Sequence, residues 1–320
     1  MPPKPRILVI GSANVDFVTK LKRLPNPDET IFSEGPYLQT PGGKGINTAV
    51  CAKRLGADAL LCTRVGADNN GMLLRKCLSE ENLDIRYVKI DKKFQTGFEI
   101  MIYDENDCLR TINHTGANFF ILPADVEDAF TCYPDCLVLD FDMNYDTVLC
   151  AIKSAAEMNI PVIADACSPF CEENAALQGD FEIFILDEKQ AYFYTGIKPV
   201  NADSFLKICI DLYNKISTKF IVLLLEDKGA YIYDGLHYSI IPSFYVRRSD
   251  LLAAKDSFTA SLAYEYLRSS DIISAVKYAN AVFAITSARP GTLSSLPENE
   301  NLVLSFIKNG GNFDFQKNHL

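Results

Sequence analysis

The sequence predicts an α/β protein in which a doubly wound, mostly parallel central sheet is flanked by helices and carries a small β-sheet lid. From residue 124 onward, short apolar runs alternate with helical patterns, which is the rhythm of βαβ units. The run FIVLLL at 220–225 is apolar at every position, as expected of a strand covered on both faces. A hairpin pattern at 97–113, around the turn DEND, has few helical neighbours and predicts the small sheet.

The remaining elements follow in order along the chain. A first strand is predicted at 6–10, and the helix TAVCAKRLGAD at 48–58 follows a glycine turn. Further strands are predicted at 60–65, 85–90, 136–140, 160–164, 183–186, 230–233 and 238–241. Further helices are predicted at 71–80, 146–158, 188–194, 204–215, from 258 onward and at 272–288, with 309–320 frayed. We assign 1–12, 41–94 and 117–320 to an α/β core domain, and 13–40 and 95–116 to the region that forms the small sheet.

Composition excludes several classes of function. The chain has 320 residues, is 48% hydrophobic and carries a formal net charge of −10, so no basic surface for nucleic acid is expected. No apolar run is long enough to cross a bilayer. The N-terminal segment MPPKPRILVIGS is too short in its apolar part for a signal peptide. We therefore expect a cytoplasmic protein that has neither a membrane nor a nucleic acid as a partner.

The ten cysteines do not form a recognisable metal motif. Cys62, Cys136, Cys150 and Cys209 fall in apparent core segments, and no CxxC pair occurs. A chain of this length does not need a disulfide framework. We expect buried free thiols.

A polar pair follows the first strand. Asn14 and Asp16 alternate, so in an extended segment they point the same way. They lie where a strand leaves the carboxyl edge of a sheet, which is where open α/β sheets bind ligands. An amide beside a carboxylate suits adjacent sugar hydroxyls, although a simple turn would also explain the pattern.

The motif PGGKGIN at 41–47 is the first of two glycine- or small-residue turns that open into a helix. Gly42, Gly43 and Gly45 allow the backbone to approach a ligand closely, and a helix N-terminus attracts anions. The spacing is not that of a Walker A loop. No GxGxxG follows the first strand, which weighs against a nicotinamide-dependent oxidoreductase.

The second turn, SDLLAAKD at 249–256, also opens into a helix. Unpaired backbone N–H groups at that helix start would hold a phosphate. Asp256, in the same turn, could take a proton from an alcohol lying beside the phosphate. A helix cap is the simpler role for an isolated aspartate, and the motif upstream favours the catalytic one.

Over nearly its whole length the chain resembles the ribokinase-like, or PfkB, family of sugar and nucleoside kinases. The motifs that carry the resemblance are GSANVD, PGGKGIN, GAN and AAKDSF, in this order. The GGKGxN form is most similar to that of the ribokinase branch. The resemblance implies a kinase that transfers the γ-phosphate of ATP, with Mg²⁺, to a hydroxyl of ribose or a related pentose or nucleoside. It also implies a lid that can form a homodimer contact.

The resemblance implies roles for individual residues. Those that would bind the sugar are Asn14, Asp16, Gly42, Gly43, Lys44, Asn47 and Asp142, with Asp256 as the general base. Those on the nucleotide side are Asp187 in the magnesium motif, Leu224, Glu226 and Gly229 along the nucleotide, Ala253, Ala254 and Lys255 in the anion hole, and Asn280 near the base. Those expected to hold a monovalent cation such as K⁺ are Asp250, Gly291 and Ser295.

The departures from the family pattern fall on the nucleotide side. Lys255 stands where the family has a glycine, Gln190 where it has a glutamate, and Glu226 where it has a glycine. The alternative is therefore a sugar-binding pseudokinase of the same fold, which kept the acceptor pocket and lost efficient transfer.

Overall fold

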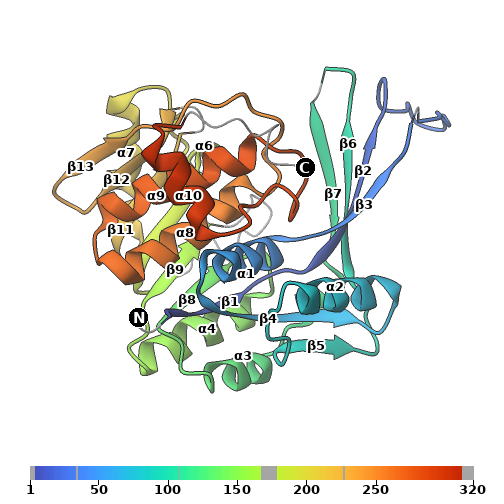
Figure 1. Ribbon diagram of the computed structural model, residues 1–320, viewed down its shortest axis with the longest axis horizontal. Coiled ribbons are helices and arrows are strands. Elements are labelled where there is room, and N and C mark those ends of the chain that lie inside the picture. The colour runs from blue at the N-terminus through green and yellow to red at the C-terminus, as the bar shows by residue number, and fades with distance from the viewer. Residues whose placement is uncertain (1–3, 34, 107, 167–178, 226–227, 312–320) are drawn as a thin grey trace.

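The computed structural model describes residues 4–33, 35–106, 108–166, 179–225 and 228–311. Within these residues, the main sheet has nine strands in the order β13-β12-β11-β10-β9-β8-β1-β4-β5 (Figure 1). All neighbouring strands are parallel except at one edge, where β12 and β13 are antiparallel. The strands are β1 (Arg6–Ile10), β4 (Asp58–Gly66), β5 (Val88–Asp91), β8 (Cys136–Asp140), β9 (Val162–Asp165), β10 (Phe181–Asp187), β11 (Thr218–Leu224), β12 (Ala230–Tyr233) and β13 (Tyr238–Ile241).

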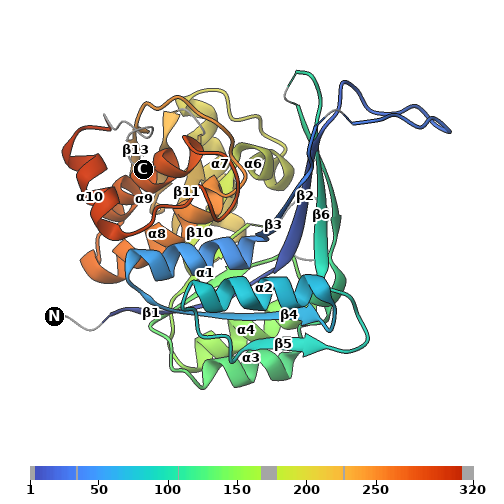
Figure 2. The same ribbon diagram turned by 45° about the vertical axis from the view of Figure 1, so that its right-hand side comes forward.

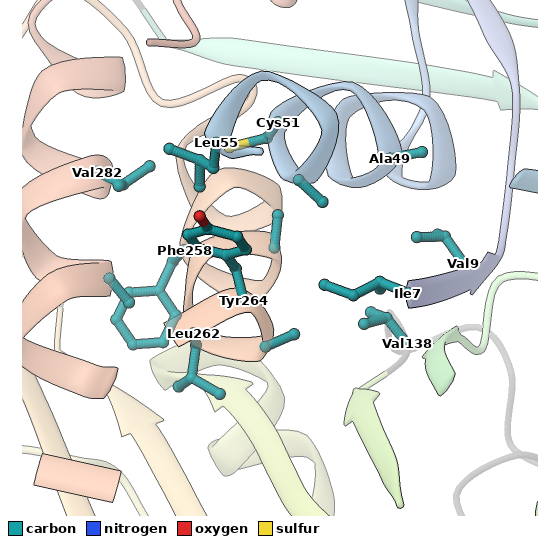
Figure 3. Packing of buried hydrophobic residues seen from close by; sticks show 14 of the residues in the cluster. Ile7, Val9, Ala49, Cys51, Leu55, Val138, Phe258, Leu262, Tyr264 and Val282 are labelled. Carbon is teal, nitrogen blue, oxygen red and sulfur yellow. The ribbon is translucent and has the colours of Figure 1, made fainter. Parts of the chain in front are cut away.

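Helices cover both faces of this sheet, which confirms the predicted fold class. One face packs against α1 (Lys44–Leu55), α2 (Asn69–Glu80), α8 (Ala254–Ser269), α9 (Ile272–Ser287) and α10 (Glu300–Lys308). The other packs against α3 (Pro123–Phe130), α4 (Tyr145–Glu157), α6 (Glu188–Thr195) and α7 (Ala202–Lys215). Alternate residues of a strand serve the two cores: Ile7 and Val9 of β1 face α1 and α8, while Leu8 and Ile10 face the opposite layer. Figure 3 shows part of the first of these cores, in which the ring of Tyr264 of α8 points toward Leu55 of α1.

A second sheet stands off the main body (Figures 1 and 2). Within the described residues it has four strands, β3 (Leu38–Gly42), β2 (Asn14–Lys20), β6 (Gly97–Tyr103) and β7 (Leu109–His114), in that order. A 3₁₀ helix, η1 (Gly116–Phe120), follows β7 and returns the chain to the core. Because only three residues separate the end of β1 from the start of β2, the two sheets meet at residues 11–13. This junction brings the polar start of β2 to the carboxyl edge of the main sheet.

The structure differs from the predicted elements at several boundaries. Helix α1 begins at Lys44, four residues before the predicted start, and ends at Leu55 because Gly56 adopts a φ of 113°. Residues 13–40 were assigned to the small sheet without individual strand bounds, and β3 extends beyond them into the glycine motif, to Gly42. Helix α10 was also missed: the Asn299 side chain caps it by accepting a hydrogen bond from the Leu302 amide at 3.1 Å.

The cysteines within the described residues are free thiols. Cys62, Cys136 and Cys209 are buried, as expected, whereas Cys150 is half-buried. Burial raises the pKa of Cys209 to about 12, so this thiol stays protonated and behaves as a small apolar side chain. Among the helices that the structure describes, none combines the length and apolar character needed to cross a membrane.

Helix α10 contributes to stability through Phe306. This side chain is fully buried and lies 5.2 Å from the ring of Phe244, centroid to centroid. We expect Phe306→Ala to lower the free energy of unfolding by about 3–5 kcal/mol, because it removes buried apolar contacts and leaves a cavity. Urea denaturation measures the change. Leu304→Ala, on the exposed side of the same helix, is the matched control, and an equal loss in both variants would contradict the assignment.

Candidate active site

The two small-residue turns predicted from the sequence meet at the carboxyl edge of the main sheet. The Asn47 side chain in α1 donates a hydrogen bond from Nδ2 to Oδ2 of Asp256 in α8, at 2.8 Å, across 209 positions of sequence. Gly45 permits this approach, because a Cβ atom there would lie 2.6 Å from the carbonyl carbon of Gly11. The start of α1 is therefore packed against the end of β1, with the start of α8 beside it.

The lid strand β2 supplies the first polar pair. Asn14 is fixed from two sides: its Oδ1 accepts a hydrogen bond from Asn118 Nδ2 at 2.7 Å, and its Nδ2 donates to Glu99 Oε1 at 3.2 Å. Asp16 is 1% exposed, and its Oδ1 has no hydrogen-bond partner among the described residues. A Cβ atom at Gly42 would lie 1.9 Å from Asp16 Oδ2, so only glycine fits there. A buried carboxylate oxygen without a partner is expected where a ligand hydroxyl completes the hydrogen bonding.

Lys44 lies between two carboxylates at the end of β8. Its Nζ is 2.5 Å from Asp142 Oδ2 and 3.8 Å from Asp140 Oδ1. Burial opposes the charged form of Lys44, but Asp142, Asp140 and Asp165 outweigh it and raise the pKa well above its ordinary value. Asp140 is held in turn by Ser12, whose hydroxyl donates to Oδ2 at 3.2 Å. The predicted sugar-binding residues Lys44 and Asp142 thus form one ion pair beside Asn47 and Asp256.

The carboxyl groups of this edge ionise with difficulty. Burial raises the pKa of Asp256 to about 7, the hydrogen bond from Asn47 opposes the rise, and the charge of Asp165 adds to it. Burial also raises the pKa of Asp16 to about 8, assisted by the charges of Glu99 and Asp256. For Asp140 the same cause raises the pKa to about 6. A pKa near 7 is suited to a group that must both accept and release a proton near neutral pH.

The start of α8 forms the phosphate end of the site. Ala253 and Ala254 are buried, and the Ala254 amide donates to the Leu251 carbonyl oxygen at 3.2 Å. Among the described residues, no acceptor is found for the amides of Lys255 and Asp256, which leaves these N–H groups available to an anion. Of the amides predicted to form the anion hole, that of Ala254 already has a hydrogen-bond partner in the chain.

Lys255 reaches away from this turn, toward the ends of β9 and β10. Its Nζ lies 2.5 Å from Asp165 Oδ1, 2.5 Å from Gln190 Oε1 and 3.9 Å from Asp187 Oδ2. Asp187 caps α6 by accepting a hydrogen bond from the Gln190 amide at 2.8 Å, and Gln190 Oε1 accepts one from the Asp187 amide at 2.8 Å. The sequence motif expected to organise magnesium is thus a helix cap that also binds a lysine.

The other predicted nucleotide-side residues are more widely spread. Leu224 ends β11, and Gly229, with a φ of 102°, closes a turn by accepting a hydrogen bond from the Leu225 amide at 2.8 Å. Glu226 lies outside the described residues. Asn280 of α9 is buried, and its Nδ2 donates to the carbonyl oxygens of Ile241 and Pro242 at 3.0 and 3.1 Å. Asn280 therefore fixes the segment that follows β13.

The loop at 290–295 contains two of the three residues expected to hold a monovalent cation, Gly291 and Ser295. The third, Asp250, is hydrogen-bonded to this loop. Asp250 Oδ2 accepts a hydrogen bond from the Gly291 amide at 2.7 Å. Ser295 is buried, and its hydroxyl donates to the Thr292 carbonyl oxygen at 2.7 Å. The Thr292 hydroxyl donates to the Pro41 carbonyl oxygen at 2.6 Å, which connects this loop to the first glycine turn.

Sequence reasoning missed several residues of the site. Asp140 and Asp165 are the last residues of the parallel strands β8 and β9, and this position was the signal that could have found them. Glu99 could not be found, because only the pairing of β6 with β2 brings it to Asn14. Asn118, in the motif GAN, also bonds Ala13: its Oδ1 accepts from the Ala13 amide at 2.9 Å, and its Nδ2 donates to the Ala13 carbonyl at 3.2 Å.

Nearly the whole chain matches one protein family. The family model described as pfkB family carbohydrate kinase matches residues 4–299. The chain belongs to this family. It is therefore a carbohydrate kinase by family, which confirms the enzyme class expected from the two motifs.

The chain is similar to individual sugar kinases over nearly the whole length of both proteins. The chain is 24% identical to the ribokinase of Haemophilus influenzae over 304 residues, covering 94% of this chain and 98% of the relative. It is 27% identical to the deoxyribokinase of Salmonella typhi over 297 residues, covering 92% and 96%. The structure of Arabidopsis thaliana ribokinase with ribose and ATP superposes with a TM-score of 0.85 at 21% identity, covering 96% and 99%. This superposition confirms the ribokinase-like fold.

Asp16 should make the stability of this PfkB protein depend on pH. An aspartate in the unfolded chain ionises near pH 4, whereas folded Asp16 does so at about pH 8. Its contribution to stability is therefore complete below pH 4 and is lost as the pH rises through 8. Asp16→Asn should raise the free energy of unfolding at pH 9, by up to about 5 kcal/mol, and much less at pH 5.

Urea denaturation at the two pH values tests this expectation. Asp28→Asn, at an exposed position of the chain, is the control for replacing a carboxylate by an amide. A stabilisation by Asp16→Asn that is equal at pH 5 and pH 9 would show that the Asp16 carboxyl is not the titrating group.

Proposed function

We propose that this protein transfers the γ-phosphate of ATP to a hydroxyl of ribose or of a related pentose or nucleoside, with Asp256 as the general base. The observation that carries the proposal is the position of Asp256. Its carboxyl group is buried, is oriented by Asn47, and lies on the first turn of α8 beside two amides for which the described part of the chain offers no acceptor. A base and an anion-binding turn thus occupy one place, next to the polar residues of the lid strand.

The acceptor end suits a small polyhydroxylated ligand. Asp16 offers a buried oxygen without a partner, and Asn47 Oδ1 is likewise buried without one among the described residues. Adjacent sugar hydroxyls would donate to these oxygens, and the Lys44–Asp142 pair would bind a further hydroxyl. The named activities of the relatives, ribokinase and deoxyribokinase, support a pentose as the acceptor.

The proposed transfer proceeds by a single displacement. The acceptor hydroxyl gives its proton to a carboxylate oxygen of Asp256 while its oxygen bonds to the γ-phosphorus. The bond from that phosphorus to the β–γ bridging oxygen breaks, and ADP leaves with the electron pair. The amides of Lys255 and Asp256 stabilise the negative charge of the phosphoryl group. Mg²⁺ enters as part of the Mg·ATP substrate.

Further roles complete the proposal. Residues 13–40 and 95–116 act as a lid that excludes water from the acceptor, and the two lid regions also provide a homodimer contact. Leu38, Leu109 and Ile112 support that contact, because they are exposed apolar residues of β3 and β7. A monovalent cation near Asp250, Gly291 and Ser295 would hold the loop at 290–295. The segment around Leu224 and Gly229 would lie along the nucleotide.

A sugar-binding pseudokinase is the second candidate. The observation that favours it is the side chain of Lys255, which fills the acidic space between Asp165 and Asp187. In this case the sugar would bind with the same residues, and no ADP would form. Turnover assays distinguish the two candidates.

Removing the base should strongly lower the rate of phosphate transfer and leave the affinity for the sugar nearly unchanged. We expect Asp256→Asn to lower the rate of sugar-dependent ADP release by about 10²–10⁴-fold, because the amide cannot accept the proton. The assay uses a panel of pentoses, hexoses and nucleosides, and calorimetry measures sugar affinity. Glu265→Gln, at the far end of α8, is the control and should turn over normally. Saturable sugar binding without turnover in the wild-type protein would support the pseudokinase instead.

The pH profile should report the same group. Since the pKa of Asp256 is raised to about 7 and the base acts in its ionised form, kcat/KM should rise from pH 5.5 and level off above about pH 7.5. This limb should be absent from the residual activity of Asp256→Asn. A wild-type profile that is flat between pH 5.5 and 8 would exclude Asp256 as the titrating base.

A further inference from the structure

The contacts of Lys255 bear on how this protein handles metal ions. Its Nζ lies 2.5 Å from Asp165 Oδ1 and 2.5 Å from Gln190 Oε1. The side chains of Lys255 and Asp165 are 19% and 6% exposed, so the ion pair is largely out of water. A Mg²⁺ ion coordinated by the same carboxylate oxygen would lie at about 2.0–2.1 Å from it. The ammonium group and a metal ion therefore compete for one position.

Several other polar atoms of this pocket already have hydrogen-bond partners. Asp165 Oδ2 accepts a hydrogen bond from the Thr259 hydroxyl at 3.2 Å, and Asp187 Oδ1 accepts one from the Gln190 amide at 2.8 Å. Gln190 Nε2 donates to the Ala166 carbonyl oxygen at 2.6 Å. Among the described residues, no group of three histidine, cysteine, aspartate or glutamate side chains is arranged to hold a metal ion. A resident metal ion therefore does not fit this pocket.

We propose that Lys255 is a tethered cation that excludes divalent metal from the pocket formed by Asp165, Asp187 and Gln190. The lysine belongs to the same helical turn as Asp256, and its side chain carries the charge from that turn to the ends of β9 and β10. Held by Asp165, it supplies a positive charge whose position does not depend on the concentration of free metal. The proposed phosphate transfer then needs only the metal that ATP itself carries.

The inference refines the donor side of the proposed function, and its test does not require turnover. Titration with Mn²⁺ alone, followed by the electron paramagnetic resonance signal of the free ion, measures binding in the absence of nucleotide. The wild-type protein should show no site tighter than millimolar. Lys255→Ala should gain a site at least tenfold tighter, because Asp165 and Asp187 lose their counter-ion. Asp165→Asn in the Lys255→Ala background should remove that site.

A matched control uses another lysine–carboxylate pair. Lys219 Nζ lies 2.6 Å from Glu182 Oε1 in an exposed ion pair, and Lys219→Ala should create no Mn²⁺ site. A tight Mn²⁺ site in the wild-type protein that is lost in Asp165→Asn would overturn the proposal, and this comparison needs no Lys255 variant. Unchanged Mn²⁺ binding in a folded Lys255→Ala protein would overturn it as well. Both tests measure Mn²⁺ binding alone, so their outcome does not depend on whether the protein is an active kinase.

Discussion

The central constraint on the site is that several carboxyl groups lie buried together at one edge of the main sheet. Parallel strands bring Asp140 and Asp165 to this edge as their last residues, and α8 adds Asp256. Two lysines, each from the first turn of a helix, neutralise part of the charge: Lys44 beside Asp142 and Lys255 beside Asp165. Buried charges of like sign are costly unless they are paired or protonated. Burial, with a smaller contribution from neighbouring carboxylates, raises the pKa values of Asp16 and Asp256.

This arrangement divides the site into two ends of different character. At the lid, Asp16 with a pKa of about 8 is largely protonated near neutral pH, so it can donate as well as accept a hydrogen bond toward an uncharged ligand. At the start of α8, backbone amides for which the described residues offer no acceptor provide positive potential, which suits an anionic ligand. Asp256 stands between them with its pKa at about 7. The group proposed to accept the proton thus lies between the end of the site that suits an uncharged ligand and the end that suits an anionic ligand.

The sequence predicted the alternation of strands and helices and the two turns that open into helices, because both depend on local patterns and on the order of motifs. It could not predict the partner of Lys255, since that contact joins α8 to the ends of β9 and β10 across 90 and 65 positions, at Asp165 and Gln190. It missed α10, whose cap at Asn299 gives only a short signal. It also missed Glu99, because this residue comes to Asn14 through the pairing of β6 with β2 and not through any spacing in the sequence.

The junction between the two sheets is bridged by one side chain. Ala13 belongs to neither sheet, and its amide and carbonyl are both satisfied by the Asn118 carboxamide, which also bonds Asn14. Gly11 and Ser12 are held to the main body by backbone hydrogen bonds: the Gly11 amide donates to the Cys62 carbonyl oxygen at 3.3 Å, and the Ser12 carbonyl oxygen accepts from the Ile46 amide at 3.2 Å. The Asn118 carboxamide extends this anchorage into the second sheet, because it binds both the Ala13 backbone and the Asn14 side chain. The orientation of the Asn14 amide thus depends on an asparagine that lies outside both sheets.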